Sequence, residues 1–240
     1  MTPTTAPAPP LARPRPGECH VWTLPVRHRP EWLDVLTAAE RARLDTLGDG
    51  PAAATHLTSR AVQRLIGSGY LGVPPAEIRI GRRCEHCGAG HGRPRWTGST
   101  LDYSVSHARE WLVMAVVGDG RVGVDIDRLD PGQNPTALAA HTLTAAEARD
   151  FAALPAHRRP QAFLTAWTRK EAAMKLTGHG LAAPPSRIDV TGPTAHAPAV
   201  PAWPRDPVHL RPLPAPPGHT AALATTHPVT SISPSGLPWA

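Results

Sequence analysis

The sequence predicts an α+β protein of two similar lobes, each a small antiparallel sheet packed with helices. Short runs of alternating apolar residues, typical of strands, are separated by longer helical segments. Two segments are alike, Thr37–Leu44 (TAAERARL) and Thr144–Phe151 (TAAEARDF), and each opens a capped helix that is followed by a longer helix and then strands. A chain of 240 residues has enough length for two such lobes.

Proline-rich ends set the predicted domain boundaries. Residues 1–17 are of low complexity and are expected to form a disordered lead. We assign residues 18–120 to an N-terminal lobe and residues 121–228 to a C-terminal lobe. Residues 229–240 are expected to be a flexible tail.

In the N-terminal lobe, a strand is expected at residues 19–24 and a helix at residues 31–47, where Thr37 and Glu40 form a capping box. A second helix at residues 52–69 should end at Gly67 and Gly69. The strands that follow are expected at residues 78–80, 101–105 and 111–117.

The C-terminal lobe should begin with a strand at residues 122–127, reached through the turn Gly118–Gly120. A helix capped by Thr144 and a longer helix within Gln161–Leu181 should follow. Short strands are expected at the end of the chain, at residues 187–190, 208–210 and 220–224.

Composition narrows the class of protein. The formal net charge of +6 indicates an anionic partner: a phosphate-bearing ligand, an acidic protein or nucleic acid. Three cysteines, an odd count, argue against a disulfide framework. The sequence shows no secretory signal and no apolar run long enough to span a membrane, so we expect a cytoplasmic protein.

Acidic side chains alternate with apolar ones on the strand at residues 122–127. Its Val and Ile residues should face a core, which leaves Asp125 and Asp127 together on the other side, roughly 6–7 Å apart. Carboxylates that close repel each other unless a proton or cation lies between them. On the later helix, Glu171 and Lys175 share a face by their spacing of four.

Two interpretations of these four residues remain open from spacing alone. Oxygen ligands of this kind suit Mg²⁺, which completes its coordination shell with water and substrate phosphates, and the nearby ammonium suits the same phosphates. The alternative is an ordinary i,i+4 surface pair beside a solvated strand face, and spacing by itself favours it.

A glycine-rich connection, Arg82–Trp96, contains the motif CEHC followed by His91. One CxxC with a nearby histidine provides half of a zinc site, but the sequence shows no second pair of ligands. The glycine content favours a plain turn with reduced thiols.

The paired motifs GVDIDRLDP and FLTAWTRKEAAMKLTGHGL, with 44 positions from Asp127 to Glu171, resemble the 4′-phosphopantetheinyl transferase superfamily. The upstream motifs SVSHA (Ser104–Ala108) and HGRP (His91–Pro94) resemble the two-lobed, Sfp-type branch. The resemblance extends from about Thr37 to Pro185.

The resemblance implies that a cleft between the lobes holds a metal ion and coenzyme A. Asp125, Asp127 and Glu171 match the residues that hold Mg²⁺, or Mn²⁺ in its place, on the pyrophosphate. Glu171 also matches the group that accepts a proton from the attacking serine. Lys175 would stabilise charge on the phosphates.

Five further residues are expected to contact coenzyme A. Lys170 and His107 match contacts to the coenzyme, and His107 is expected at the 3′-phosphate. Arg93 stands where the family often has lysine. Arg60 and Arg64 lie on the helix that supplies an arginine to the nucleotide end.

The reaction implied is transfer of the phosphopantetheine arm to a serine of apo acyl- or peptidyl-carrier domains, with release of 3′,5′-ADP, by a monomeric enzyme. The positive charge would favour the acidic helix of a carrier. A rival from another class is a non-catalytic binder of nucleic acid or phosphorylated ligand, but the sequence shows no nucleic-acid motif. A third hypothesis is a member of the family that has lost activity, but the intact acidic trio argues against it.

Overall fold

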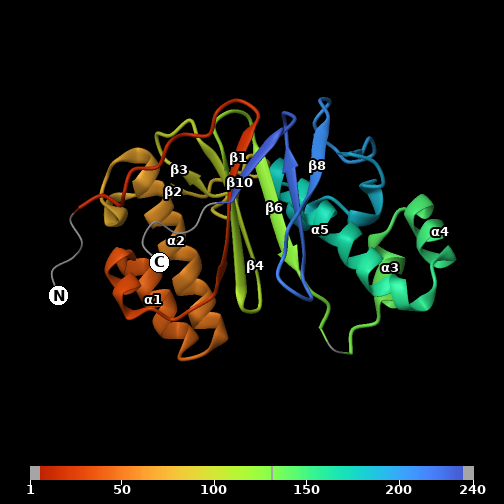
Figure 1. The fold of residues 1–240 in the computed structure, drawn as a ribbon, viewed down its shortest axis with the longest axis horizontal. Helices are drawn as coiled ribbons and strands as arrows, with labels where there is room; N and C mark the ends of the chain where they lie inside the picture. Colours follow the sequence, from red (N-terminus) through yellow and green to blue (C-terminus); the bar gives the residue numbers. More distant parts are fainter. Residues whose placement is uncertain (1–5, 131, 235–240) are drawn as a thin grey trace.

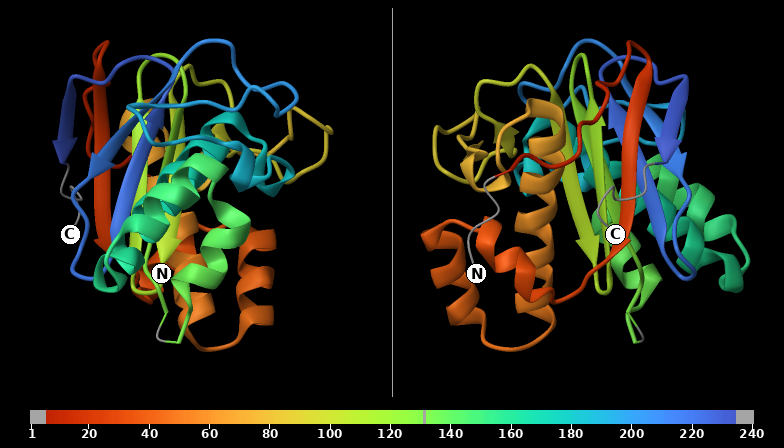
Figure 2. Two further views of the ribbon diagram at one scale, coloured as in Figure 1. Left: turned by 90° about the vertical axis from the view of Figure 1, so that its right-hand side faces the viewer. Right: turned by 60° about the vertical axis from the view of Figure 1, so that its left-hand side comes forward.

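The structure is a computed structural model that describes residues 6–130 and 132–234. Two four-stranded sheets lie side by side in the middle of the molecule, and helices cover the two outer flanks (Figure 1). Two further views show α1 and α2 on one flank and α3, α4 and α5 on the other (Figure 2). The predicted α+β fold class and its two sheet-and-helix lobes are therefore confirmed.

Most strands of the two sheets run antiparallel. The first sheet has the order β10-β1-β5-β4 and the second the order β6-β9-β8-β7, while β2 and β3 form a separate pair. Only β1 and β10 pair in parallel within the described sheets. The strands are β1 (Glu18–Pro25), β2 (Ile80–Gly81), β3 (Arg95–Trp96), β4 (Asp102–Ala108), β5 (Trp111–Val117), β6 (Val122–Asp127), β7 (Thr194–Ala195), β8 (Val208–Leu213), β9 (Thr220–Thr225) and β10 (Ser231–Pro234).

Each lobe contributes a capped helix followed by a longer one. The helices are α1 (Ala38–Leu47), α2 (Pro51–Leu71), α3 (Pro135–Thr142), α4 (Ala145–Ala153) and α5 (Arg159–Thr177). The described residues also include five short 3₁₀ helices: Pro30–Val35, Pro75–Glu77, Ala156–Arg158, Gly180–Ala182 and Pro185–Arg187. None of the helices in the described ranges has the length and hydrophobicity needed to cross a membrane.

Both predicted capping boxes are present. At α1, the Thr37 hydroxyl accepts from the Glu40 N–H, and the Glu40 carboxylate accepts from the Thr37 N–H. Thr144 and Glu147 make the same exchange at α4. Such caps satisfy N–H groups that a helix start would otherwise leave without partners.

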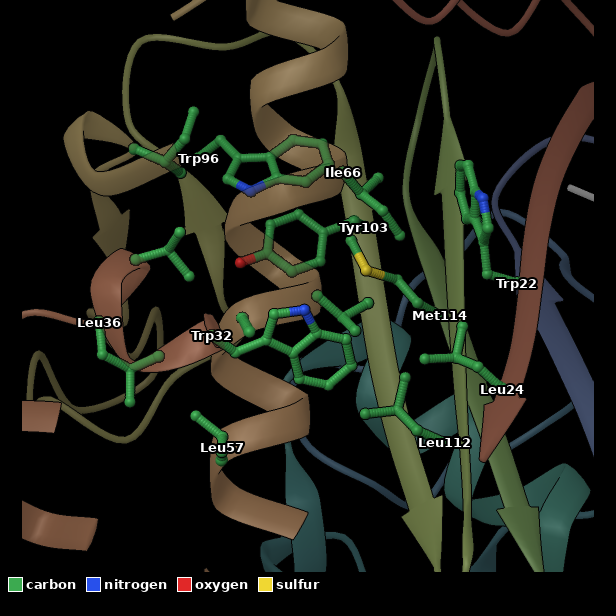
Figure 3. Packing of buried hydrophobic residues seen from close by; sticks show 14 of the residues in the cluster. Trp22, Leu24, Trp32, Leu36, Leu57, Ile66, Trp96, Tyr103, Leu112 and Met114 are labelled. Carbon is green, nitrogen blue, oxygen red and sulfur yellow. The ribbon is translucent and has the colours of Figure 1, made fainter. Parts of the chain in front are cut away.

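The core of the N-terminal lobe lies between α2 and the first sheet. Leu57 and Ile66 on α2 pack toward Leu112 and Met114 on β5, and all four are fully buried (Figure 3). Trp96 belongs to the same cluster and donates its Nε1–H to the carbonyl of Gln63 on α2. Trp96 therefore links β3 to α2 through both packing and a hydrogen bond.

The two faces of β6 have different neighbours. Val122, Val124 and Ile126 join a cluster with the first sheet, so the predicted alternation is correct for the apolar face. The opposite face is not the expected half-exposed surface, because α5 covers it and every β6 residue before Asp127 is buried. The acidic face of the strand is therefore inside the molecule.

The ends of the chain differ from the prediction. Within the predicted lead, Leu11 N–H donates to the Gly69 carbonyl of α2 (2.9 Å), and Ala8 N–H donates to the Ser68 hydroxyl. Residues 231–234 of the predicted tail form β10, beside β1. Hydrogen bonds to α2 and to the first sheet hold these segments in place, and composition does not reveal such long-range contacts. Residues 1–5 and 235–240 lie outside the described residues.

Candidate active site

A polar seam joins the edge strands of the two sheets, β4 and β6. The Asp102 carboxylate accepts from the Val122 N–H (2.8 Å), and the Ser104 hydroxyl accepts from the Val124 N–H (3.1 Å). Side chains at every second position of β4 therefore satisfy the backbone of β6, where a strand-to-strand ladder would otherwise do so. The next inward position is Ser106, and it reaches the acidic face of β6.

Asp125 is the buried centre of the candidate site. Its Oδ1 accepts from the Ser106 hydroxyl (2.7 Å) and from the Lys175 ammonium (2.6 Å). Its Oδ2 is buried and has no hydrogen-bond partner among the described residues. Burial raises the pKa of Asp125, and the Lys175 charge opposes that rise.

Gly123 explains why α5 can lie so close to this strand. A Cβ at Gly123 would meet the carbonyl oxygen of Ala172 and would lie 2.6 Å from the Leu176 nitrogen, both on α5. The helix backbone therefore rests directly on the strand. This contact places Glu171 and Lys175, on the α5 turns beside Ala172 and Leu176, next to the acidic residues of β6.

Glu171 is half-buried and carries a carboxyl group whose pKa is raised. Burial is the main cause, and the negative charges of Asp125 and then Asp127 add to it, while Lys175 acts in the opposite direction. Three carboxyl groups from two elements thus influence one another electrostatically.

Asp127 lies at the edge of the site. Its Oδ2 accepts from the Trp167 indole N–H (2.9 Å) and its Oδ1 from the Arg128 N–H (2.8 Å). Both carboxylate oxygens are thus hydrogen-bonded, and in the described residues the three acids do not form one compact ligand group.

A cleft follows β4 across both lobes. A cavity of about 250 Å³ is lined by Tyr103 and Val105 of β4 together with Lys175. Val105 also borders a second cavity of about 530 Å³, and Arg109 connects that one to a third, of about 550 Å³, which contains Asp127. The three cavities therefore share lining residues along β4, and Asp127 borders the third of them.

Cationic side chains surround the second cavity. Arg60 and His107, both expected as ligand contacts, line it together. Arg43, Arg82 and Arg109 line it as well, and sequence reasoning missed all three because they come from separate segments. A group of like charges around a cavity favours an anionic ligand.

Lys170 is not in this cleft. Its side chain is fully buried, and its ammonium donates to the Glu147 carboxylate (2.6 Å), the Pro185 carbonyl (3.0 Å) and the Ile188 carbonyl. An ammonium has three donors, and all three are used. The expected contact with coenzyme A is therefore corrected: Lys170 packs the C-terminal lobe.

Arg64 and Arg93 also have structural partners. Arg64 is buried and donates to Glu40 and to the Ile78 carbonyl (2.5 Å). Arg93 pairs with Asp102 and donates to the carbonyls of Val122 and Lys175 (both 2.8 Å). Arg93 also borders the 250 Å³ cavity, and its Nη1 is buried without a hydrogen-bond partner among the described residues. We therefore remove Arg64 from the expected ligand contacts, whereas Arg93 stays an expected contact.

The acidic residues nevertheless fit a divalent cation of the Mg²⁺ type. Carboxylate oxygens are the ligands that such an ion prefers. The Oδ2 of Asp125, without a partner among the described residues, is a buried acceptor available to a cation, and burial together with the charges of Asp125 and Asp127 raises the pKa of Glu171. A cation would relieve both features.

Comparisons of this chain with known proteins all point to the same family. The family model described as the 4′-phosphopantetheinyl transferase superfamily matches residues 121–216, which contain all three acids and α5. The chain is 28% identical over 187 residues to the 4′-phosphopantetheinyl transferase HetI of Nostoc sp., an alignment that covers 75% of this chain and 76% of HetI.

Two other relatives match shorter segments. The 4′-phosphopantetheinyl transferase psf-1 of Bacillus pumilus is 38% identical over 82 residues, 34% of each chain. The 4′-phosphopantetheinyl transferase AcpT of Salmonella typhi is 32% identical over 105 residues, 43% of this chain and 54% of AcpT.

Proposed function

Because this chain belongs to the 4′-phosphopantetheinyl transferase superfamily, we propose that it moves the phosphopantetheine arm of coenzyme A onto a serine hydroxyl of apo acyl- or peptidyl-carrier domains. The serine oxygen forms a bond to the phosphorus attached to the arm. The phosphorus–oxygen bond of the pyrophosphate breaks, and 3′,5′-ADP leaves with the electron pair. We include Mg²⁺ dependence in the proposal.

The observation that carries the proposal is the position of Asp125. It is a buried carboxylate with one oxygen held by Lys175 and Ser106 and the other without a partner in the described residues. Burying a charge of this kind costs free energy, so its presence here supports a functional role. Its partner Lys175 lines the 250 Å³ cavity, and further cations line the second cavity, as a phosphate-rich coenzyme would need.

The second cavity supports the nucleotide end of the ligand. His107 is solvent-exposed at its rim, and Arg60 and Arg82 stand with it. Arginine donors suit phosphate oxygens, so we assign the 3′-phosphate to this cavity. The pyrophosphate would then lie toward Lys175, along β4, and the arm beyond it.

Near Lys175, the chain supplies charge and a proton acceptor. The Lys175 ammonium is placed to meet a phosphate oxygen of the pyrophosphate, since it already lies at the Ser106–Asp125 pair. Glu171 takes the serine proton in this proposal, directly or through water, and its raised pKa brings it closer to neutral pH than an ordinary glutamate. Asp125, Asp127 and Glu171 would hold Mg²⁺, which neutralises the pyrophosphate.

One chain supplies both walls of the cleft, so we propose that the enzyme acts as a monomer. Its three cysteines are free thiols, which agrees with a reducing compartment such as the cytoplasm. The net charge of +6 would attract a carrier domain with an acidic surface.

The proposed function is tested by incubating the purified protein with coenzyme A, Mg²⁺ and a panel of apo carrier domains. Intact-mass measurement should show the carrier heavier by one phosphopantetheine unit, and 3′,5′-ADP should appear in equal amount. A carrier whose acceptor serine is replaced by alanine is the control and should gain nothing. The absence of any mass gain across acyl and peptidyl carriers would refute the proposal.

A further inference from the structure

The loop between β2 and β3 (residues 82–94) gathers three potential metal ligands. The Sγ atoms of Cys84 and Cys87 and a ring nitrogen of His91 lie within 4.8 Å of one another. The Cys87 Sγ is 3.0 Å from the His91 Nε2. The structure thus places His91 beside the two cysteines, a proximity that the sequence alone did not establish.

The backbone of the loop is shaped to hold this group. The Cys84 N–H donates to the Ala89 carbonyl (2.7 Å) and the Gly88 N–H returns to the Cys84 carbonyl (2.9 Å). Gly88 has φ +77°, a conformation that side-chain-bearing residues rarely adopt. A Cβ at Gly92 would lie 2.6 Å from the Cys84 nitrogen, so the loop segment that carries His91 packs directly against the cysteine backbone. The cluster is a product of a tightly closed turn.

We propose that Cys84, Cys87 and His91 bind one zinc ion, with water in the fourth position, and that the ion fixes the β2–β3 loop as a wall of the ligand cleft. Zinc favours thiolate and imidazole ligands in tetrahedral geometry, and bonds of about 2.0–2.3 Å place the ligand atoms about 3.3–3.8 Å apart. The separations in the loop need little adjustment to reach that geometry. Two thiols lose their protons on binding, so the ion and its ligands are neutral overall.

The charge and exposure of the loop suit this assignment. Backbone N–H groups of Cys87 and His86 hydrogen-bond the Cys84 sulfur. Cys84 is buried, whereas Cys87 and His91 are exposed, so an ion can enter from solvent. No fourth cysteine, histidine or acidic residue of the described chain joins the group, which leaves one position for water.

The loop contacts both lobes, so its order matters for the cleft. Arg82 and His91 line the 250 Å³ cavity. His86, between the two cysteines, contacts the Thr177 carbonyl at the end of α5 through its Nε2 (3.1 Å), and its ring lies 4.2 Å from that of His179. A metal at the cysteines would therefore fix residues that border the cavity from two directions.

The zinc site is tested on the full chain without any activity assay. Protein expressed with zinc and purified without chelator is analysed for metal by mass spectrometry, and apoprotein is titrated with Co²⁺. We expect stoichiometric zinc and, with cobalt, the intense visible bands and sulfur charge-transfer absorption of a tetrahedral thiolate site. Cys87→Ser and His91→Ala should each lose zinc by at least tenfold in affinity. Cys19→Ala is the matched control, because it removes the remaining thiol away from the loop, and it should keep the metal.

A second measurement covers the variants that fold poorly. In the wild-type protein, removing zinc with a chelator should increase amide hydrogen exchange in residues 82–94 and leave the β1–β5 pairing unchanged. Absence of stoichiometric zinc together with an octahedral cobalt spectrum would overturn the proposal, as would zinc that persists in both loop variants or exchange that does not change on chelation. These outcomes are independent of carrier modification, so the zinc site and the proposed transferase function can fail separately.

Discussion

The Nζ of Lys175 lies 2.6 Å from the Oδ1 of Asp125, and the Oδ2 of the same carboxylate has no partner in the described residues. The chain therefore holds one oxygen of Asp125 in place, and the other is the oxygen to which the proposed cation would bind. Because the carboxylate is buried, its charge depends on Lys175 and on whatever meets the second oxygen. This division of one side chain between a structural and a ligand-binding contact is the basis of the first prediction.

Asp125→Asn should lower the rate of carrier modification by about 10²–10³ or more, since it removes charge from a preorganised site while keeping the shape. The rate is measured by intact mass at saturating coenzyme A, with circular dichroism to show that the variant is folded. Asp119→Asn, which changes an exposed acid, is the control and should keep full activity. An Asp125→Asn enzyme as fast as the wild type would mean that the acid is not part of the reaction centre.

Gly123→Ala should destabilise the protein by about 1–3 kcal/mol, because the added methyl group would push the α5 backbone away from β6. We expect carrier modification to fall as well, since Glu171 and Lys175 move with the helix. Urea unfolding measures the stability. Gly192→Ala is the control: an added Cβ there meets nothing within 4 Å, and its stability should match the wild type. Equal midpoints for both variants would contradict the close packing.

Lys170→Ala should cost about 3–5 kcal/mol in the free energy of unfolding, because it leaves the buried Glu147 charge without its partner. The KM for coenzyme A of the folded fraction should stay at the wild-type value. Denaturant unfolding and steady-state kinetics separate these effects.

A double variant provides the control for that prediction. Lys170→Met combined with Glu147→Gln removes both charges and should recover part of the lost stability, since neither charge is left unpaired. A large increase in the KM of Lys170→Ala, with little loss of stability, would instead return Lys170 to the coenzyme site.

The affinity for coenzyme A should fall as pH rises through the titration of His107. In the free protein the pKa of His107 lies below its usual 6.5. The main cause is that neighbouring groups displace water from the ring, and the positive charge of Lys175 is the second. A bound phosphate stabilises the imidazolium and raises the pKa of the same ring. Between the two pKa values the complex binds more protons than the free protein, so binding takes up a proton there. The dissociation constant should increase with pH, by at most about tenfold per unit.

Calorimetric titration of coenzyme A at several pH values tests this dependence. The 3′-phosphate itself titrates near pH 6, so the comparison is with His107→Gln, which keeps that contribution and loses the imidazole. Dephospho-coenzyme A, which lacks the 3′-phosphate, should bind with no His107-dependent slope. Identical slopes for wild type and His107→Gln would place the phosphate elsewhere.

Much of the local structure follows from short-range sequence patterns. The caps at Thr37 and Thr144 and the strand at Val122–Asp127 are where the pattern predicts them, because capping and alternation depend on neighbouring residues. The predicted strand at residues 187–190 is instead a 3₁₀ turn followed by an isolated bridge at Asp189. Prolines on both sides of that short run limit its pairing.

The family was also predictable, because the motifs around Asp127 and Glu171 stand at a specific separation, and the comparisons confirm it. The contacts of individual cations were not. Lys170 and Lys175 lie five positions apart on α5, yet one enters the core of the C-terminal lobe and the other reaches Asp125. Residues five apart on a helix point in clearly different directions, and only the packing around α5 determines what each meets.

The sequence by itself determined most of the helices and strands, the family and the types of residue available for chemistry. The tertiary structure decided which residues come together: Ser106 with Asp125, Arg82 and His107 around one cavity, and His91 with the two cysteines. The physical reason is range. Helix caps and strand alternation depend on residues a few positions apart, whereas burial and ion pairing depend on elements that approach only once Gly123 lets α5 lie against β6.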